Sequence, residues 1–169
     1  MLRNLLIIMA ISVFATSCLK NDSSQQCPYA PLNTAVPQAE QNALATFIDT
    51  NHIPATRHPK GFYYNIVTPG SGTDSLGMCS NVLIDYKGSL TNGSEFDSGE
   101  NKAFAYALLI EGMQNGLSLI RSGGEIHLFV PPSLGYGVTP VKNKDSVVVI
   151  PPNSILAFDV KLKSYTATY

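Results

Sequence analysis

Residues 82–98 read VLIDYKGSLTNGSEFDS, and this stretch predicts two antiparallel strands joined by a tight turn. Val82, Ile84 and Tyr86 occupy every second position, which is the period of a strand with one buried face. The pair Asn92-Gly93 is the strongest short-range signal for a hairpin, because both residue types adopt positive φ angles readily. We therefore expect a half-buried strand that turns back on itself at once.

Outside this hairpin, three further segments have the composition of strands and one has that of a short helix. Strands are predicted over residues 61–68, 126–130 and 156–162, from aromatic and β-branched residues in the first and apolar alternation in the others. Residues 113–120 predict a short helix, because apolar side chains four and three residues apart share one face. Several strands around one short helix indicate an α+β domain with an antiparallel sheet.

A longer helix is predicted ahead of the sheet, over residues 37–50. Pro37 suits the first turn of a helix, and Leu44, Phe47 and Ile48 form an apolar stripe at helical spacing. We expect this stripe to pack on the main domain.

The first 17 residues have the features of a bacterial export signal. Arg3 supplies the positive charge, and residues 5–14 form an apolar stretch that is short for a membrane span. Small residues then lead to Cys18, which resembles a bacterial lipobox with Ala15 in the usual place of leucine. The resemblance implies that Cys18 is lipidated and becomes the first mature residue; the alternative is ordinary cleavage that leaves this cysteine unmodified.

The mature chain is expected to have three parts. Residues 18–36 are predicted to be the lipidated cysteine and a flexible tether, because the tether begins with a uniformly hydrophilic run. Residues 37–60 form a helical extension, and residues 61–169 form the main domain. Lys20 and Asp22 resemble the surface-export signals of Bacteroidetes lipoproteins. We expect a chain anchored by lipid to the outer membrane, on its periplasmic face or at the cell surface.

Two cysteines remain if Cys18 is lipidated. Exported chains meet an oxidising compartment, so we expect Cys27 and Cys79 to form a disulfide that fixes the N-terminal segment to the domain. Two free thiols are the alternative. Metal binding is not expected, because no second cysteine or histidine stands at ligand spacing.

Length and charge limit the remaining possibilities. The 169 residues suit one domain with extensions, and the formal net charge of −1 gives no electrostatic reason to expect nucleic-acid binding. A surface glycan-binding lipoprotein is a third alternative, but such proteins use exposed stacking aromatic residues and the chain contains no tryptophan.

Several sequence blocks, taken in order over residues 61–165, resemble the FKBP family. They comprise a strand ending in Tyr-x-Gly, a turn ending in Phe-Asp-Ser, a short strand, a helix segment with two glycines, a Pro-x-x-x-Tyr-Gly segment, and closing Ile-Pro-Pro and Phe-Asp-Val motifs. In this chain the blocks are residues 82–88, 92–98, 104–106, 109–117, 123–137, 150–153 and 156–160. The resemblance implies an FKBP-like twisted antiparallel sheet wrapped around one short helix, and a peptidyl-prolyl cis/trans isomerase.

The same resemblance implies an apolar pocket between the sheet and the short helix. The residues implied as catalytic are Tyr86, Phe96, Asp97, Tyr136 and Phe158, and those implied as substrate-binding are Phe104, Leu109, Ile110, Met113 and Ile150. The Tyr136 hydroxyl and the Ile150 backbone amide are implied as hydrogen-bond donors to the substrate carbonyl. For any one of the aromatic residues taken alone, packing in the core is the alternative.

The resemblance also implies the reaction and its partners. Rotation about a prolyl bond requires neither nucleophile nor cofactor, only a site that lowers a barrier of roughly 18–20 kcal/mol. We expect a monomer that acts on proline-containing polypeptides of the cell envelope and binds macrolide inhibitors. Three departures from the family pattern concern activity: Met113 replaces the usual tryptophan, no arginine follows Asp97 before Phe104, and the loop at residues 138–148 is long. A catalytically weak chaperone or interaction module is therefore the alternative.

Overall fold

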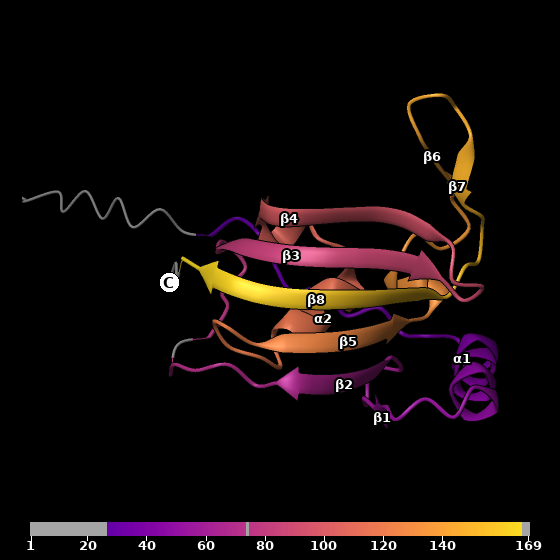
Figure 1. Ribbon diagram of the computed structural model, residues 1–169, viewed down its shortest axis with the longest axis horizontal. Helices are drawn as coiled ribbons and strands as arrows, with labels where there is room; N and C mark the ends of the chain where they lie inside the picture. The colour runs from indigo at the N-terminus through magenta and orange to yellow at the C-terminus, as the bar shows by residue number, and fades with distance from the viewer. Residues whose placement is uncertain (1–26, 74, 167–169) are drawn as a thin grey trace, which may run out of the picture.

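A computed structural model describes residues 27–73 and 75–166 of the chain. One six-stranded antiparallel sheet has the order β1-β2-β5-β8-β3-β4 (Figure 1). Its strands are β1 (Thr56–Arg57), β2 (Tyr63–Thr68), β3 (Asn81–Leu90), β4 (Glu95–Ala105), β5 (Glu125–Val130) and β8 (Leu156–Tyr165). The helices are α1 (Gln38–Thr50), α2 (Glu111–Leu117) and the single 3₁₀ turns η1 (Tyr106–Leu108) and η2 (Pro132–Leu134). The predicted α+β fold, an antiparallel sheet with one short helix against it, is confirmed.

The hairpin expected from residues 82–98 is present as β3 and β4. Gly93 has a φ of 85°, and the turn is closed by the Leu90 amide, which donates to the Ser94 carbonyl at 2.9 Å. β3 also pairs with β8 on its other side, with Val82 opposite Tyr165 and Leu90 opposite Leu156. The paired strands are long, and they carry most of the side chains of the site described below.

The short helix starts earlier and ends earlier than predicted. It covers Glu111–Leu117, because Ile110 has extended backbone angles and Glu111 can begin the helix with a favourable negative charge. After Leu117 the chain continues in tight turns, with the Ile120 amide donating to the Leu117 carbonyl. The apolar spacing continues through those turns, so the pattern alone placed the helix about two residues too late.

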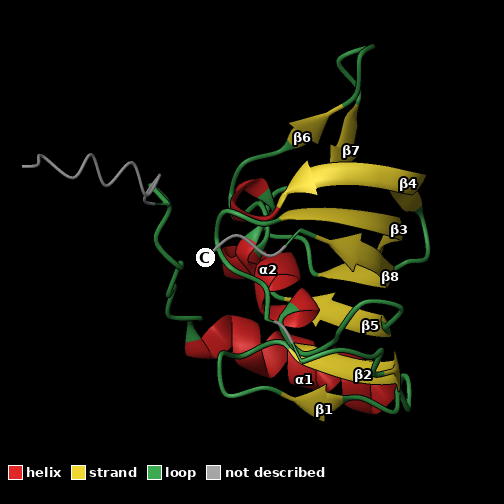
Figure 2. Ribbon diagram, turned by 90° about the vertical axis from the view of Figure 1, so that its left-hand side faces the viewer, coloured by secondary structure: helices red, strands yellow, loops and turns green. Residues whose placement is uncertain are grey.

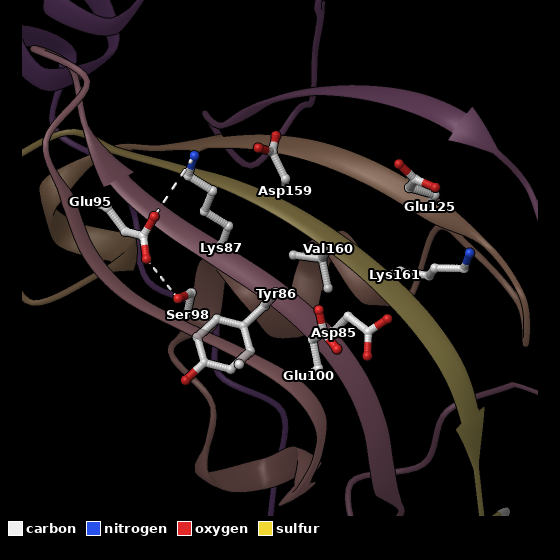
Figure 3. A pocket seen from close by; sticks show the side chains of 11 residues that line it. Asp85, Tyr86, Lys87, Glu95, Ser98, Glu100, Glu125, Asp159, Val160 and Lys161 are labelled. Atoms are coloured by element: carbon white, nitrogen blue, oxygen red, sulfur yellow. Dashed lines mark hydrogen bonds and ion pairs between the residues drawn. The ribbon is translucent and has the colours of Figure 1, made fainter.

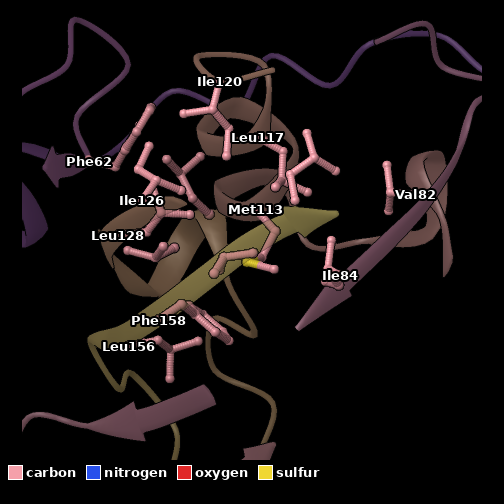
Figure 4. Packing of buried hydrophobic residues seen from close by; sticks show 14 of the residues in the cluster. Phe62, Val82, Ile84, Met113, Leu117, Ile120, Ile126, Leu128, Leu156 and Phe158 are labelled. Atoms are coloured by element: carbon pink, nitrogen blue, oxygen red, sulfur yellow. The ribbon is translucent and has the colours of Figure 1, made fainter. Parts of the chain in front are cut away.

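Two glycines let α2 lie unusually close to β5. A Cβ atom at Gly112 would be 2.3 Å from Cγ1 of Val130, and one at Gly116 would be 2.4 Å from both Cδ atoms of Leu128. The residues of the core lie between α2 and the sheet (Figure 4). Its buried side chains include Phe62, Val82, Ile84, Met113, Leu117, Ile120, Ile126, Leu128, Val130, Leu156, Phe158 and Val160. This packing fixes α2, and with it the part of the pocket that α2 supplies.

The helix predicted over residues 37–50 is present as α1, with Pro37 at its N-cap. Its apolar stripe packs on the main domain as expected: Leu44 and Ile48 are buried, and the rings of Phe47 and Phe129 lie 6.3 Å apart. Glu40 adds a polar contact, because its carboxylate accepts a hydrogen bond of 2.8 Å from the Ser133 amide.

The segment that leads into α1 is also bound to the domain. Cys27 and Cys79 form the expected disulfide, with their Cα atoms 5.6 Å apart. Further along, the Thr34 amide donates to the buried carboxylate of Glu111 at 3.1 Å, which joins this segment to the start of α2. These contacts lie within the stretch predicted as a tether. The predicted export signal, Cys18 and the first part of the tether lie outside the described residues. Among the described helices, none has the length and apolar character needed to cross a membrane.

Residues 138–148, expected as a long loop, contain a second small sheet. β6 (Val141–Lys142) pairs with β7 (Val148–Ile150) as a hairpin that stands beyond the edge strand β4 (Figure 2). The hairpin therefore lies at the end of the main sheet where β4 begins.

Candidate functional site

A pocket of about 230 Å³, called the aromatic pocket below, lies between the inner face of the sheet and the segment that runs from η1 into α2. Its lining consists of Ile84, Tyr86, Phe96, Asp97, Phe104, Leu108, Leu109, Ile110, Met113, Tyr136 and Phe158. These residues come from β3, β4, β8, the segment from η1 into α2, and the loop after η2, so distant parts of the sequence meet here.

The structure places nine of the ten pocket residues predicted from the sequence around this pocket. The exception is Ile150, which is buried and lines a neighbouring cavity instead. Its role as a backbone donor stays a prediction. The sequence reasoning missed Ile84 and Leu108. Ile84 carried a usable signal, because it alternates on the same strand face as Tyr86. Leu108 is 74% exposed beside the pocket and lies outside any periodic pattern, so no signal pointed to it.

The pocket has a closed apolar base and aromatic sides. Met113 and Phe158 are only 4% and 6% exposed and form its base. The ring of Phe158 meets that of Phe96 edge-on at 5.6 Å, and Tyr86 meets Phe104 in the same way at 5.7 Å. Edge-to-face pairs of this kind hold rings in fixed orientations. The aromatic side chains are therefore preorganised around the space between them.

Polar groups lie on one side of this apolar space. The Tyr86 hydroxyl donates to the carboxylate of Asp97 at 2.7 Å. Desolvation, followed by this bond and the charge of Asp97, raises the pKa of Tyr86 to about 12. Burial and the same charge also raise the pKa of Tyr136. Both phenols thus keep their protons at neutral pH. The Tyr136 hydroxyl has no partner among the described residues, so its proton remains available.

The segment that carries Leu109 and Ile110 is held by partly buried hydrogen bonds from Gln114. Gln114 donates from its side-chain amide to the carbonyls of Ala107 and Leu109, at 3.1 and 2.8 Å. The Tyr106 hydroxyl donates in turn to the Gln114 carbonyl. Gln114 and Tyr106 were not predicted as functional residues. They touch the backbone rather than the pocket space, so they position the pocket residues.

A larger cavity of about 410 Å³ lies on the outer face of the sheet, and its side chains are mostly charged (Figure 3). Glu95 there approaches Lys87 at 3.8 Å and accepts a hydrogen bond of 2.6 Å from Ser98. Exposed pairs of this kind are a common feature of solvated sheet faces. Apolar enclosure and an unpaired donor distinguish the smaller aromatic pocket, which we take as the candidate site. In residues 27–73 and 75–166, no cluster of three histidine, cysteine or acidic side chains is placed to hold a metal ion.

Comparison with known proteins identifies a family and several relatives of this chain. The sequence pattern of the family described as "FKBP-type peptidyl-prolyl cis-trans isomerase" matches residues 75–163, which is more than half of the chain. FkpA of Buchnera aphidicola from Schizaphis graminum is 39% identical over 106 residues, and FkpA of Escherichia coli K12 is 41% identical over 106 residues. Both matches cover 60% of this chain, but the chain spans only 40% and 37% of the lengths of those relatives.

Solved structures are similar over a larger part of the chain. The crystal structure of FkpA from Escherichia coli has a TM-score of 0.61 and 33% identity, and the match covers 76% of this chain and 58% of that one. A peptidyl-prolyl cis-trans isomerase from Pseudomonas syringae has a TM-score of 0.62 and 25% identity. That match covers 79% of this chain and 99% of the other.

Proposed function

Because this chain belongs to the FKBP-type peptidyl-prolyl cis-trans isomerases, we propose that it catalyses rotation about prolyl peptide bonds in the aromatic pocket. The observation that carries the proposal is the combination of a buried apolar base with a phenol, Tyr136, whose proton has no partner among the described residues.

The apolar base explains how the barrier falls. A planar prolyl amide has charge on its oxygen, and that charge is partly lost when the bond twists. Transfer into a site lined by Met113, Phe158 and Phe96 removes water from the amide and disfavours the planar form more than the twisted one. Each ~1.4 kcal/mol by which the barrier falls gives about a tenfold faster rotation. The edge-on aromatic rings hold the proline ring while the bond rotates.

The polar side of the pocket orients the substrate. We assign Tyr136 as the hydrogen-bond donor to the substrate carbonyl, because its phenol remains protonated and unpaired. The proton of the Tyr86 hydroxyl is already donated to Asp97. Tyr86 and Asp97 therefore act together, each fixing the other at the entrance of the pocket. No step needs a nucleophile or a general base.

Proline-containing polypeptides of the cell envelope are the proposed substrates. The disulfide between Cys27 and Cys79 supports an exported location, because disulfides persist in oxidising compartments. Lipidation at Cys18 would anchor the domain to the outer membrane. Metabolic labelling with a fatty-acid probe tests this step: the wild type should be labelled and Cys18→Ala should not, and equal labelling would reject the anchor.

The test of the enzymatic proposal is the relaxation of a short Leu-Pro peptide from cis to trans, measured with the purified full chain. The uncatalysed reaction takes tens to hundreds of seconds. Tyr136→Phe removes one hydroxyl, so loss of a hydrogen bond of about 0.5–1.5 kcal/mol should lower kcat/KM about two- to tenfold. Tyr63→Phe is the matched control, because Tyr63 lies on β2 outside the pocket.

Two results would count against the proposal. A well-folded wild type that does not accelerate relaxation would reject catalysis and favour the binding-module alternative. Equal activities of Tyr136→Phe and Tyr63→Phe would reject Tyr136 as the donor.

Phe96→Ala should lower kcat/KM more than Phe129→Ala, because only Phe96 lines the pocket.

A further inference from the structure

The β6–β7 hairpin adds a second cavity beside the aromatic pocket. This hairpin cavity has a volume of about 320 Å³. Three residues line both spaces, so the two adjoin each other: Phe96, Asp97 and Tyr136. The hairpin supplies most of the remaining lining, namely Val141, Lys142, Asn143, Lys144, Val149 and Ile150. A peptide with its proline in the aromatic pocket would place a neighbouring residue against the hairpin.

The hairpin is closed by a hydrogen bond at its base, and its tip is ordered by hydrogen bonds of its own. At the base, the Asn153 amide donates to the Gly137 carbonyl at 2.7 Å. At the tip, the Asn143 side chain accepts hydrogen bonds of 3.0 Å from the amides of both Asp145 and Val147. Val149 is half-buried against the core. The backbone around the second cavity is therefore ordered, so that binding there orders mainly the exposed lysine side chains.

The hairpin cavity has an excess of positive charge. Lys142 and Lys144 line it together with one carboxylate, Asp97. In the part of the chain that the structure describes, neither lysine takes part in an ion pair. Asp97 already accepts a hydrogen bond from the Tyr86 hydroxyl. The two ammonium groups outnumber the single carboxylate, and this excess of positive charge favours a negatively charged ligand group.

We propose that the hairpin cavity is a specificity subsite that favours an aspartate or glutamate close in sequence to the isomerised proline. The inference rests on the proposed function and narrows its substrate class. Consecutive residues of an extended peptide advance about 3.3–3.6 Å each, so a side chain within three residues of the proline can reach the hairpin. Exposed ion pairs change equilibria by about 1.4- to fivefold each, and two lysines that share one carboxylate are not fully additive, so we expect about a two- to tenfold preference.

The test uses a set of Leu-Pro peptides that differ at one position, with Glu, Gln or Lys at each of three positions on either side of the dipeptide. We expect kcat/KM to be about two- to tenfold higher for Glu than for Gln at one position or more, and lowest for Lys. The preference should disappear in 1 M salt, where the screening length is about 3 Å. A Glu to Gln ratio of one at every position would overturn the proposal.

Paired variants separate a local effect from one of net charge. Lys142→Gln with Lys144→Gln should bring the Glu to Gln ratio close to one. Lys87→Gln with Lys161→Gln removes the same charge from the outer face of the sheet, and it should retain the wild-type ratio. An equal loss in both double variants, or no loss in the first, would overturn the proposal.

Titration calorimetry compares the affinities of the Glu and Gln peptides, and it does not depend on catalysis. We expect the Glu peptide to bind more tightly than the Gln peptide at the same position. Absence of isomerisation with every peptide would reject the proposed function. The ratio of affinities for the Glu and Gln peptides would still decide whether the subsite exists.

Discussion

Gly112→Ala tests whether the close approach of α2 to β5 is essential to the fold. A new Cβ would lie 2.3 Å from Cγ1 and 2.8 Å from Cγ2 of Val130, which is fully buried in β5. Valine is stiff about χ1 and its own Cβ would be 3.1 Å away, so rotation of the side chain cannot relieve the contact. Either the helix or the strand must move.

Two effects of opposite sign decide the outcome. Alanine is favoured over glycine in a helix by up to about 1 kcal/mol. Overpacking a close-packed core costs about 1–3 kcal/mol. The steric cost should prevail, giving a net loss of about 1–2 kcal/mol in the free energy of unfolding. The shift of α2 should also lower isomerase activity, because Ile110 and Met113 move with it.

Urea denaturation with the disulfide intact measures the effect, read from a lower midpoint at unchanged slope. Gly116→Ala should cost less, because the atoms it meets are the flexible ends of Leu128. Adding Val130→Ala to Gly112→Ala should recover about 1 kcal/mol or more relative to the sum of the single changes. A stability of Gly112→Ala equal to or above that of the wild type would refute the reasoning.

The disulfide, the buried hydroxyl of Tyr106 and the base of the pocket can each be tested by substitution. Replacing Cys27 and Cys79 by serine should lower the free energy of unfolding by up to about 4 kcal/mol, since the disulfide closes a loop of 52 residues; an unchanged urea midpoint would contradict this. Burial raises the pKa of Tyr106 to about 12, so its contribution to stability is present below about pH 10, the ordinary tyrosine value, and is lost toward pH 12. The free energy of unfolding should therefore fall less steeply between about pH 10 and 12 in Tyr106→Phe than in the wild type. Identical pH dependence in the two proteins would contradict this role of Tyr106. Met113→Trp should raise kcat/KM about two- to tenfold, because a rigid ring avoids the cost of immobilising a flexible side chain; circular dichroism controls for folding, and lower activity in a folded variant would contradict it.

The architecture was predictable because its signals are local and periodic. Alternation in residues 82–86 correctly assigned β3 and its buried face, and Asn92-Gly93 correctly placed the turn. The resemblance to a family then brought together pocket residues from β3, β4, α2 and β8, which periodicity alone cannot do. Leu108 was not predicted to line the pocket, because an exposed leucine in a 3₁₀ turn has no distinguishing sequence pattern.

The hairpin of β6 and β7 could not be assigned from the sequence for a different reason. Its strands are two and three residues long, too short for an alternating pattern to be recognised. Its tip depends on the side-chain amide of Asn143, whose hydrogen bonds are evident only once the backbone is placed. Likewise, the bond between Thr34 and Glu111 joins residues 77 positions apart, and nothing in the local sequence of either residue predicts the other.

The position of the disulfide determines how an anchored domain would face its surroundings. Cys79 precedes β3, whereas the β6–β7 hairpin stands beyond the other end of that strand (Figure 1). With lipid at Cys18, as proposed, the nine residue steps to Cys27 extend to at most about 30 Å, so the domain would stay close to the bilayer. The anchor would then lie at one end of the domain, and the β6–β7 hairpin with its cavity would lie at the other. Such an enzyme would act only within a short distance of the lipid surface. It would meet its polypeptide substrates as they leave or approach the membrane rather than throughout the compartment.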